Sequence, residues 1–149
     1  MEKLDFSAEE LLEQARSNQT AFWHLALAWT RQRDWTVDTW AGFVGRHFAR
    51  SWDEMGDDPS ALQVARTAAL NVATTADMRP VKLSGDDSRA ELVIEGPDEE
   101  WLNDFGTTLD DTDRANEMIF RAIAERRGLK LEARRDEAGL HLIFMRGLS

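Results

Sequence analysis

The chain has 149 residues, of which 28 are Asp or Glu and 18 are Lys or Arg, so its formal net charge at pH 7 is -10. That length suits one domain with its own core, taken as residues 1–149. The absence of cysteine excludes disulfide scaffolds, Cys-ligated zinc and thiol catalysis. The acidic balance disfavours nucleic-acid and membrane partners, and the acidic start without an apolar leader makes a cytoplasmic location the expectation.

Two helices are predicted at the start of the chain. Ser7 and Glu10 have the form of a capping box, which begins a first helix over residues 8–16. Residues 17–20, Ser-Asn-Gln-Thr, predict a break or a second cap, because short polar side chains compete for helix backbone bonds. The next helix runs to about Arg33 and is apolar on almost every side, so we expect it to be central in the fold.

Two further helices complete the mainly helical part, residues 1–78. Thr36 caps a third helix, whose apolar residues form one stripe and which ends at Gly56. Asp58 and Pro59 open a fourth helix, because proline is well tolerated at the first helical position. This helix is predicted to end near Asp77.

Two β-hairpins are predicted in residues 79–149. Residues 81–83 and 91–95 flank one cluster of turn formers, and residues 129–134 and 140–145 flank another. Two hairpins suggest one four-stranded antiparallel sheet. The predicted fold class is therefore α+β, with about five helices, mostly N-terminal, packed on that sheet.

A fifth helix joins the hairpins. One of residues 110–112, Asp-Asp-Thr, is expected to cap it, and Gly128 ends it. Alternation in residues 129–134 predicts one buried sheet face. The continuous apolar runs 92–94 and 142–145 indicate that part of the other face is covered too, which a partner subunit would explain.

Six tryptophans in a chain without tyrosine are the first candidates for a functional site. They could line a pocket for an apolar or planar ligand, or they could be plain core residues. Two of them, on the stripe of the third helix, fit core packing. The candidate pocket tryptophans are Trp23, Trp29, Trp40 and Trp52.

The histidines are the second candidates. His24 and His47 could contact a ligand, or act as acid–base groups beside a carboxylate, whereas a core role suits His24 in its apolar helix. No HxxxH, HxxE or HExxH spacing occurs, so no metal site is predicted. The carboxylate-rich stretches suit helix N-termini better than cation sites. No cofactor is predicted.

Glycine motifs point to packing rather than to chemistry. Gly42 and Gly45 form a pair inside the third helix, which permits the close approach of another helix. The pair lacks the lysine and hydroxyl of a P-loop and the preceding strand of a Rossmann motif. No GxSxG occurs, so serine-hydrolase chemistry has no motif here.

Residues 122–132, AIAERRGLKLE, followed by residues 139–144, GLHLIF, resemble the 4-vinyl reductase domain, as does the order of elements over the C-terminal two-thirds. The resemblance implies helices on a four-stranded antiparallel sheet, frequent dimers, and binding of small hydrophobic molecules or a sensory role. The cysteines usual in that family have no counterpart, so no metal or redox role is carried over. A second family of similar layout, the L-2-amino-thiazoline-4-carboxylate hydrolase type, uses a cysteine nucleophile that this chain lacks.

The sequence thus favours a small-molecule-binding or sensory domain, a homodimer, with an apolar pocket between helices and sheet. The candidate ligand-binding residues are Trp23, His24, Trp29, Trp40, His47 and Trp52. One alternative is a hydrolase or isomerase that uses His24 or His47 with a carboxylate. Another is a structural module that presents an exposed aromatic patch to another chain.

Overall fold

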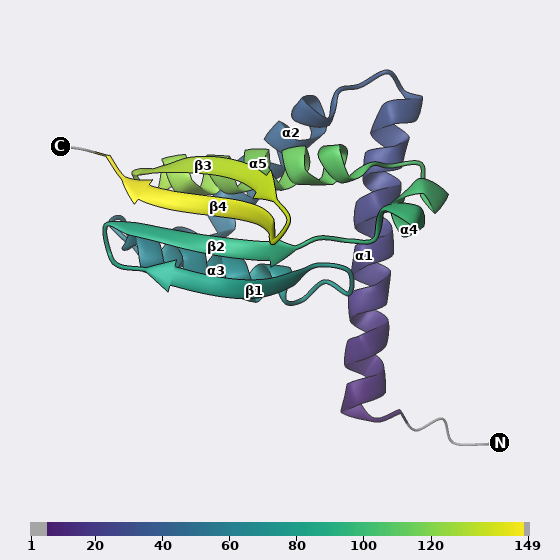
Figure 1. The fold of residues 1–149 in the computed structure, drawn as a ribbon, viewed down its shortest axis with the longest axis horizontal. Helices are drawn as coiled ribbons and strands as arrows, with labels where there is room; N and C mark the ends of the chain where they lie inside the picture. Colours follow the sequence, from purple (N-terminus) through teal and green to yellow (C-terminus); the bar gives the residue numbers. More distant parts are fainter. Residues whose placement is uncertain (1–5, 148–149) are drawn as a thin grey trace.

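The computed structural model describes residues 6–147 and shows helices covering one face of a four-stranded antiparallel sheet (Figure 1). The strand order is β1-β2-β4-β3, so the two hairpins meet through β2 and β4. The predicted α+β class is confirmed. In chain order the elements are α1 (Ala8–Gln32), α2 (Val37–Ser51), η1 (Asp53–Met55), α3 (Ala61–Val72), β1 (Arg79–Gly85), β2 (Arg89–Glu95), α4 (Glu99–Asp104), α5 (Leu109–Arg126), β3 (Leu129–Asp136) and β4 (Gly139–Arg146).

Helix α1 is continuous over 25 residues, so the predicted break at residues 17–20 is wrong. The polar side chains in this stretch bond away from the helix backbone. The Gln14 amide donates to the Asn18 carbonyl oxygen one turn later, at 2.8 Å, and the Thr20 hydroxyl accepts from the backbone N–H of Ala76 at 2.9 Å. Because the side chains find other partners, they do not compete for the helix hydrogen bonds.

The predicted central position of this apolar helix is also wrong. In Figure 1, α1 crosses one end of the sheet, and its N-terminal half extends beyond β1. The buried residues of α1 are few: Thr20, His24, Leu27, Ala28 and Thr30. The opposite side stays in solvent, where Phe22 and Leu25 are 74% and 53% exposed. Apolar composition predicted burial on all sides, but the chain covers only one side of this helix.

The first two helix starts follow the predicted chemistry. Ser7 and Glu10 form the capping box, in which each side chain accepts from the other's backbone N–H. The Thr36 hydroxyl accepts from the backbone N–H of Thr39 and begins α2. Helix α2 ends at Ser51, and a short 3-10 turn, η1, continues the chain to Gly56.

Two other predicted caps are wrong. Helix α3 begins after Ser60 rather than after Asp58, and α5 begins after Thr108 rather than within residues 110–112. In both helices a hydroxyl oxygen accepts a hydrogen bond from the backbone N–H three residues later. The acidic residues 110–111 instead occupy the first turn of α5, where negative charge is also favourable.

Helix α3 is shorter than predicted, because it ends at Val72 rather than near Asp77. The hydroxyl groups of Thr74 and Thr75 donate to the backbone carbonyls of Asn71 and Val72, at 2.6 and 2.8 Å. These bonds satisfy carbonyl groups that a continuing helix would have used. Because α3 ends at Val72, the segment that follows it reaches α1, where Asp77 contacts His24.

The glycine pair of α2 makes the predicted packing contact through Gly45. A Cβ atom at Gly45 would lie 3.0 Å from the Ala122 Cβ and 3.1 Å from the Ile119 Cα of α5. A Cβ atom at Gly42 would meet only side-chain ends, at 3.5 and 3.8 Å. Gly45 therefore allows the backbones of α2 and α5 to approach closely.

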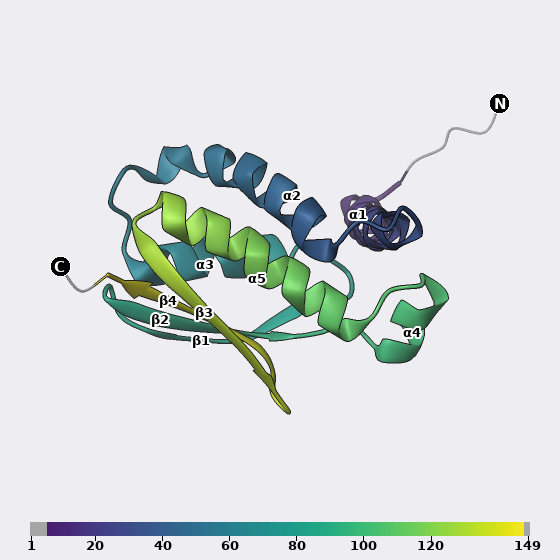
Figure 2. The same ribbon diagram turned by 90° about the horizontal axis from the view of Figure 1, so that it is seen from above.

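Both predicted hairpins are confirmed, and β2 and β4 form the middle of the sheet. Gly85 and Gly139 bound the turns with φ values of 121° and 133°, and a Cβ atom at either would lie 2.2 Å from a backbone oxygen. The inner face packs on α3 and α5 (Figure 2). Its buried side chains include Ala90, Leu92, Ile94, Leu131, Leu142 and Phe144.

The outer face of the sheet carries no helix (Figure 2), yet Val93 and Ile143 are only 2% and 5% exposed there. Lys82 lies opposite Val93 on β1, and Glu132 lies opposite Ile143 on β3. Long charged side chains bury their methylene stems along an apolar surface and keep their charged ends in water. Neighbouring strands of the same chain therefore account for these buried positions without a partner subunit.

Candidate functional site

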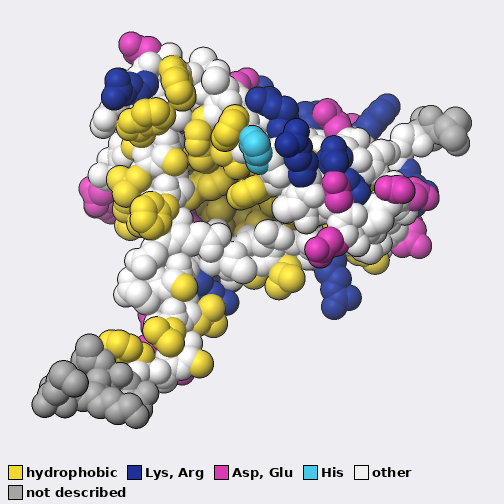
Figure 3. Space-filling view, turned by 180° about the vertical axis from the view of Figure 1, so that it is seen from behind, with side chains coloured by type: hydrophobic (Ala, Val, Ile, Leu, Met, Phe, Trp, Pro, Cys, Tyr) yellow, Lys and Arg dark blue, Asp and Glu magenta, His cyan; other side chains and the backbone are white. Residues whose placement is uncertain are grey.

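An apolar groove of about 360 Å³ lies among α1, α2, α3 and α5. Figure 3 shows a hollow on the helical side of the molecule, with hydrophobic side chains around and inside it. None of the lining residues is charged, although the chain carries 28 acidic and 18 basic residues. They are Gln19, Phe22, Trp23, Ala26, Trp40, Val44, Phe48, Trp52, Asn71, Val72, Thr75, Met78, Asn116, Ile119, Phe120 and Ile123.

Three tryptophans form part of the groove wall. Trp23 of α1 and Trp40 of α2 meet edge to face, with ring centroids 4.9 Å apart and an interplanar angle of 73°. Trp52, which follows α2, meets Phe120 of α5 in a similar arrangement at 6.3 Å. Such T-shaped pairs are favourable because the positive edge of one ring faces the negative face of the other. The aromatic pairs therefore join α1 to α2, and α2 to α5.

The other three predicted ligand-binding residues lie outside the groove. Trp29 packs edge-on against Trp35, at 5.3 Å, near the C-terminal end of α1. His47 lies 4.5 Å from the ring of Phe43 on the exposed side of α2. His24 is fully buried on the opposite side of α1 from the exposed apolar residues. The groove thus brings together half of the predicted set.

The contribution of α3 and α5 to the groove wall was not predicted from the sequence. Ile119, Phe120 and Ile123 project from α5, and Val72 ends the wall from α3. Helical periodicity identifies an apolar face on a helix such as α5, but it does not distinguish a face that lines an open groove from one inside a closed core. The groove also lies among helices, rather than between the helices and the sheet as expected.

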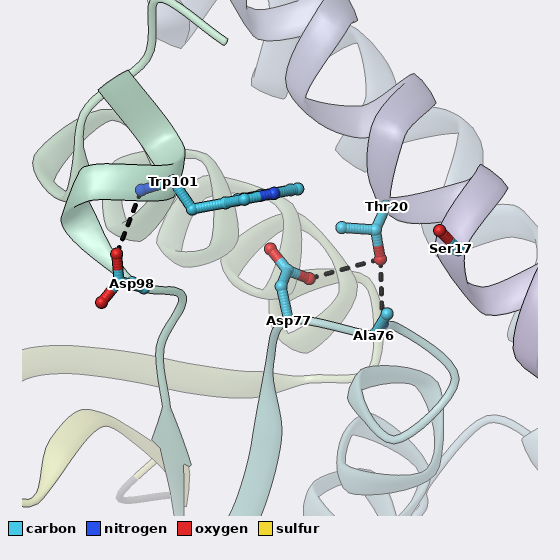
Figure 4. Close-up of a pocket in the computed structure, with 6 residues that line it drawn as sticks. All are labelled: Ser17, Thr20, Ala76, Asp77, Asp98 and Trp101. Atoms are coloured by element: carbon cyan, nitrogen blue, oxygen red, sulfur yellow. Dashed lines mark hydrogen bonds between the residues drawn. The ribbon is translucent and has the colours of Figure 1, made fainter. Parts of the chain in front are cut away.

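A second, polar pocket of about 420 Å³ lies between α1, the chain preceding β1, and α4 (Figure 4). The Thr20 hydroxyl accepts from the Ala76 backbone N–H at 2.9 Å and donates to the Asp77 carboxylate at 3.4 Å. The indole of Trp101 forms another wall, and Asp98 caps α4 through the Trp101 backbone N–H. Three segments that are distant in the sequence therefore meet around this pocket.

A histidine–carboxylate pair includes a residue of the polar pocket: Asp77 lines the pocket, and its partner His24 is fully buried. The Nε2 atom of His24 is 2.6 Å from the Oδ2 atom of Asp77. Trp101 and Phe105 pack on the imidazole, with centroid distances of 4.9 and 5.9 Å. The Nδ1 atom of His24 is buried and has no hydrogen-bond partner among the described residues. In the neutral tautomer that donates Nε2–H to Asp77, Nδ1 carries a lone pair, as in a general base, but solvent does not reach this atom.

The third histidine belongs to a charged network on the outer face of the sheet. The Nδ1 and Nε2 atoms of His141 lie 2.9 Å from Glu91 and 2.8 Å from Asp136. The hydrogen bond from His141 lowers the pKa of Glu91, and the equivalent bond lowers the pKa of Asp136 to about 2. Arg134 pairs with both carboxylates. The network ties β2, β3 and β4 together, so we interpret it as structural.

The acidic stretches act in helix caps and ion pairs. Asp53, at the start of η1, forms a bidentate pair with Arg126 at the end of α5, which lowers the pKa of the carboxyl group. Within residues 6–147, no group of three or more His, Asp or Glu side chains is placed to hold a metal ion. In that same part of the chain, no helix combines the length and the apolar character needed to cross a membrane.

Comparisons with protein-family models, with characterised proteins and with solved structures found no match to this chain. The fold and the site define an α+β domain with an uncharged apolar groove between its helices. The similarity to the 4-vinyl reductase domain stays a prediction based on the sequence. Any functional assignment therefore depends on the chemistry of the groove and the polar pocket.

Proposed function

We propose that this protein binds a hydrophobic or aromatic small molecule in the groove between α1, α2, α3 and α5. The supporting observation is a concave surface with three indole rings and no charged side chain. Its volume of about 360 Å³ lies within the range of roughly 300–1,000 Å³ that is usual for ligand pockets. Covering apolar surface gains roughly 25 cal/mol per Å², so an apolar ligand in the groove is favourable.

The lining favours an uncharged ligand with one polar group. A buried charge without a partner carries a large desolvation cost, and the groove offers no opposite charge. Four uncharged polar residues, Gln19, Asn71, Thr75 and Asn116, interrupt the apolar surface. The Asn116 amide is held by donation to the Thr112 carbonyl at 3.0 Å. A hydroxyl or carbonyl group on a planar apolar frame suits this arrangement.

N-phenyl-1-naphthylamine, a neutral probe whose fluorescence rises in apolar surroundings, tests the proposal by titration. Phe48 and Phe43 are a matched pair on α2, because they are 49% and 57% exposed but only Phe48 lines the groove. Phe48→Ala should weaken probe binding about tenfold, which corresponds to roughly 1.4 kcal/mol. Phe43→Ala should leave the affinity unchanged.

Two further measurements sharpen this test. Val44→Trp places an indole inside the groove and should abolish the fluorescence increase. Neutral 1-acetylnaphthalene should displace the probe, whereas the charged 1-naphthoate should not, because the groove has no cationic side chain. Equal probe affinity in the unmodified protein, Phe48→Ala and Val44→Trp would contradict the proposal, as would the absence of any fluorescence increase.

Acid–base catalysis is a second candidate, and the contact between His24 and Asp77 favours it. Their 2.6 Å pairing matches the geometry by which a carboxylate orients a general base. His24 is 0% exposed, so this function requires α4 to move and uncover it. Diethyl pyrocarbonate labelling followed by mass spectrometry tests that movement, with exposed His47 as the internal reference. His24 that stays unmodified after His47 has fully reacted would refute catalysis by His24.

A further inference from the structure

Helix α1 carries a stripe of uncharged residues, apolar except for Asn18, on the side that faces solvent. Its members are separated by alternating steps of four and three residues, which is the spacing of core positions in a coiled coil. All of them are exposed. We call this set the α1 seam: Leu11, Ala15, Asn18, Phe22, Leu25 and Trp29.

The seam and its borders contain no charged residue. The positions beside it are held by Leu12, Gln14, Gln19, Ala21, Ala26 and Ala28. All five Glu and Arg residues of α1 lie elsewhere on the helix: Glu9, Glu10, Glu13, Arg16 and Arg31. The chain has a net charge of -10, so two copies repel each other. The uncharged face of α1 allows two copies to come into contact without placing like charges next to each other.

The N-terminal half of α1 lacks support from its own chain. Every residue from 8 to 19 is exposed, whereas the buried positions of α1 begin at Thr20. Isolated helices shorter than about 12–15 residues are marginal in water, and most helices gain stability from tertiary packing. Leu11 and Leu12, which are 57% and 52% exposed, are the groups that such packing would cover.

We propose that the α1 seam is the interface of a homodimer, in which two copies of α1 pack antiparallel. In that arrangement the unsupported half of each helix lies along Phe22, Leu25 and Trp29 of the other copy. The contact is the same on both copies, as a two-fold axis requires. In each copy the rest of the acidic chain packs on the C-terminal half of α1 (Figure 1). Antiparallel packing therefore keeps these two acidic bodies at opposite ends of the helix pair. The polar Asn18 near the middle of the seam would set the register, since a single buried Asn does so in coiled coils.

The available area points to a reversible dimer. Phe22 and Trp29 are 74% and 46% exposed, and Leu11, Leu12 and Leu25 are each more than half exposed. Together these side chains present roughly 500–600 Å² per copy. This is comparable to the largest apolar patch of a typical monomer, about 300–600 Å², and below the roughly 800 Å² per partner of a standard interface. We therefore expect the dimer to dissociate on dilution.

Sedimentation equilibrium over a wide concentration range tests the interface. The mass should rise from 17.0 kDa toward twice that value with concentration. Leu11→Glu should keep the protein monomeric, and because Leu11 lies outside the buried core, this change leaves the fold intact. Leu70→Glu, at a side chain 67% exposed on α3, is the matched control and should dimerise normally. A mass of 17.0 kDa up to about 1 mM, or a dimer unaffected by Leu11→Glu, would overturn the proposal.

Disulfide cross-linking tests the orientation, because the chain has no cysteine of its own. The double variant Leu11→Cys/Leu25→Cys should form covalent dimers on mild oxidation. Leu11→Cys alone should not, since antiparallel packing holds the two copies of residue 11 at opposite ends of the interface. Rapid dimer formation by Leu11→Cys alone would show a parallel pair and refute the antiparallel arrangement.

Discussion

Alanine at Gly45 and at Gly42 tests whether close contact between α2 and α5 holds the groove walls in place. Glycine inside a helix costs about 0.5–1 kcal/mol relative to alanine. At Gly42 the new Cβ atom would meet only side-chain ends at 3.5 Å or more, so Gly42→Ala should stabilise the protein by that amount. At Gly45 it would lie 3.1 Å from the Ile119 Cα, a backbone atom. Overpacking costs about 1–3 kcal/mol, so Gly45→Ala should range from neutral to about 2 kcal/mol destabilising.

Urea unfolding followed by tryptophan fluorescence measures both variants. The free energy of unfolding should differ between them by about 1–3 kcal/mol. For a domain of this size, each kcal/mol corresponds to a change of about 2–4 °C in Tm. Gly45→Ala should also alter the affinity for N-phenyl-1-naphthylamine, because α2 and α5 both line the groove. Equal stabilisation by the two alanines would refute the close backbone contact at Gly45.

Three further predictions concern the sheet and the buried pair. The His141 hydrogen bond lowers the pKa of the Asp136 carboxyl group from 3.8 to about 2. The ionised carboxylate therefore stabilises the fold fully above about pH 4, and this stabilisation is lost as the pH falls through about 2. Asp136→Asn removes the titrating group, so the variant should lose less stability than the unmodified protein over this pH range. Urea midpoints across this range check it, and unchanged pH dependence would contradict it. Asp77→Ala leaves His24 without its partner and should cost about 1–3 kcal/mol in the same assay, where no loss would argue against the pair. Leu92→Ala, at a fully buried position, should cost about 2–5 kcal/mol, and a loss far below that range would argue against a packed inner face.

Features that depend on nearby residues were predictable from the sequence. The capping box at Ser7, the Thr36 cap and both hairpins follow from turn and cap chemistry within a few residues. Several neighbouring side chains can cap the same helix N-terminus, so the capping residue itself is harder to predict. Ser60 and Thr108 cap α3 and α5 in place of the acidic residues expected there. In both cases a hydroxyl oxygen was the acceptor that reached the free backbone N–H group.

The candidate site was only partly predictable from the sequence, because it is built from residues of several helices. Trp40 and Trp52 could be assigned to one stripe of the predicted third helix from their spacing, and both lie in the groove, although the structure places Trp52 just after α2. Trp29 has similar chemistry but packs on Trp35 outside the groove. Spacing within a helix defines which residues share a face, but it does not identify the element opposite that face. The α5 residues that complete the groove are far from the tryptophans in the sequence.

The sequence by itself determined the α+β class, the two hairpins and the apolar faces of the helices, because these follow from the periods of the backbone and from local turn chemistry. Only the tertiary structure decided which faces the chain covers. His24 is buried because Asp77, 53 residues later, and Trp101 pack on it, whereas Leu25, its neighbour, remains 53% exposed. Burial depends on contacts between distant segments, and local periodicity carries no information about which segments meet. The continuous apolar helix is therefore both one wall of a groove and an exposed seam.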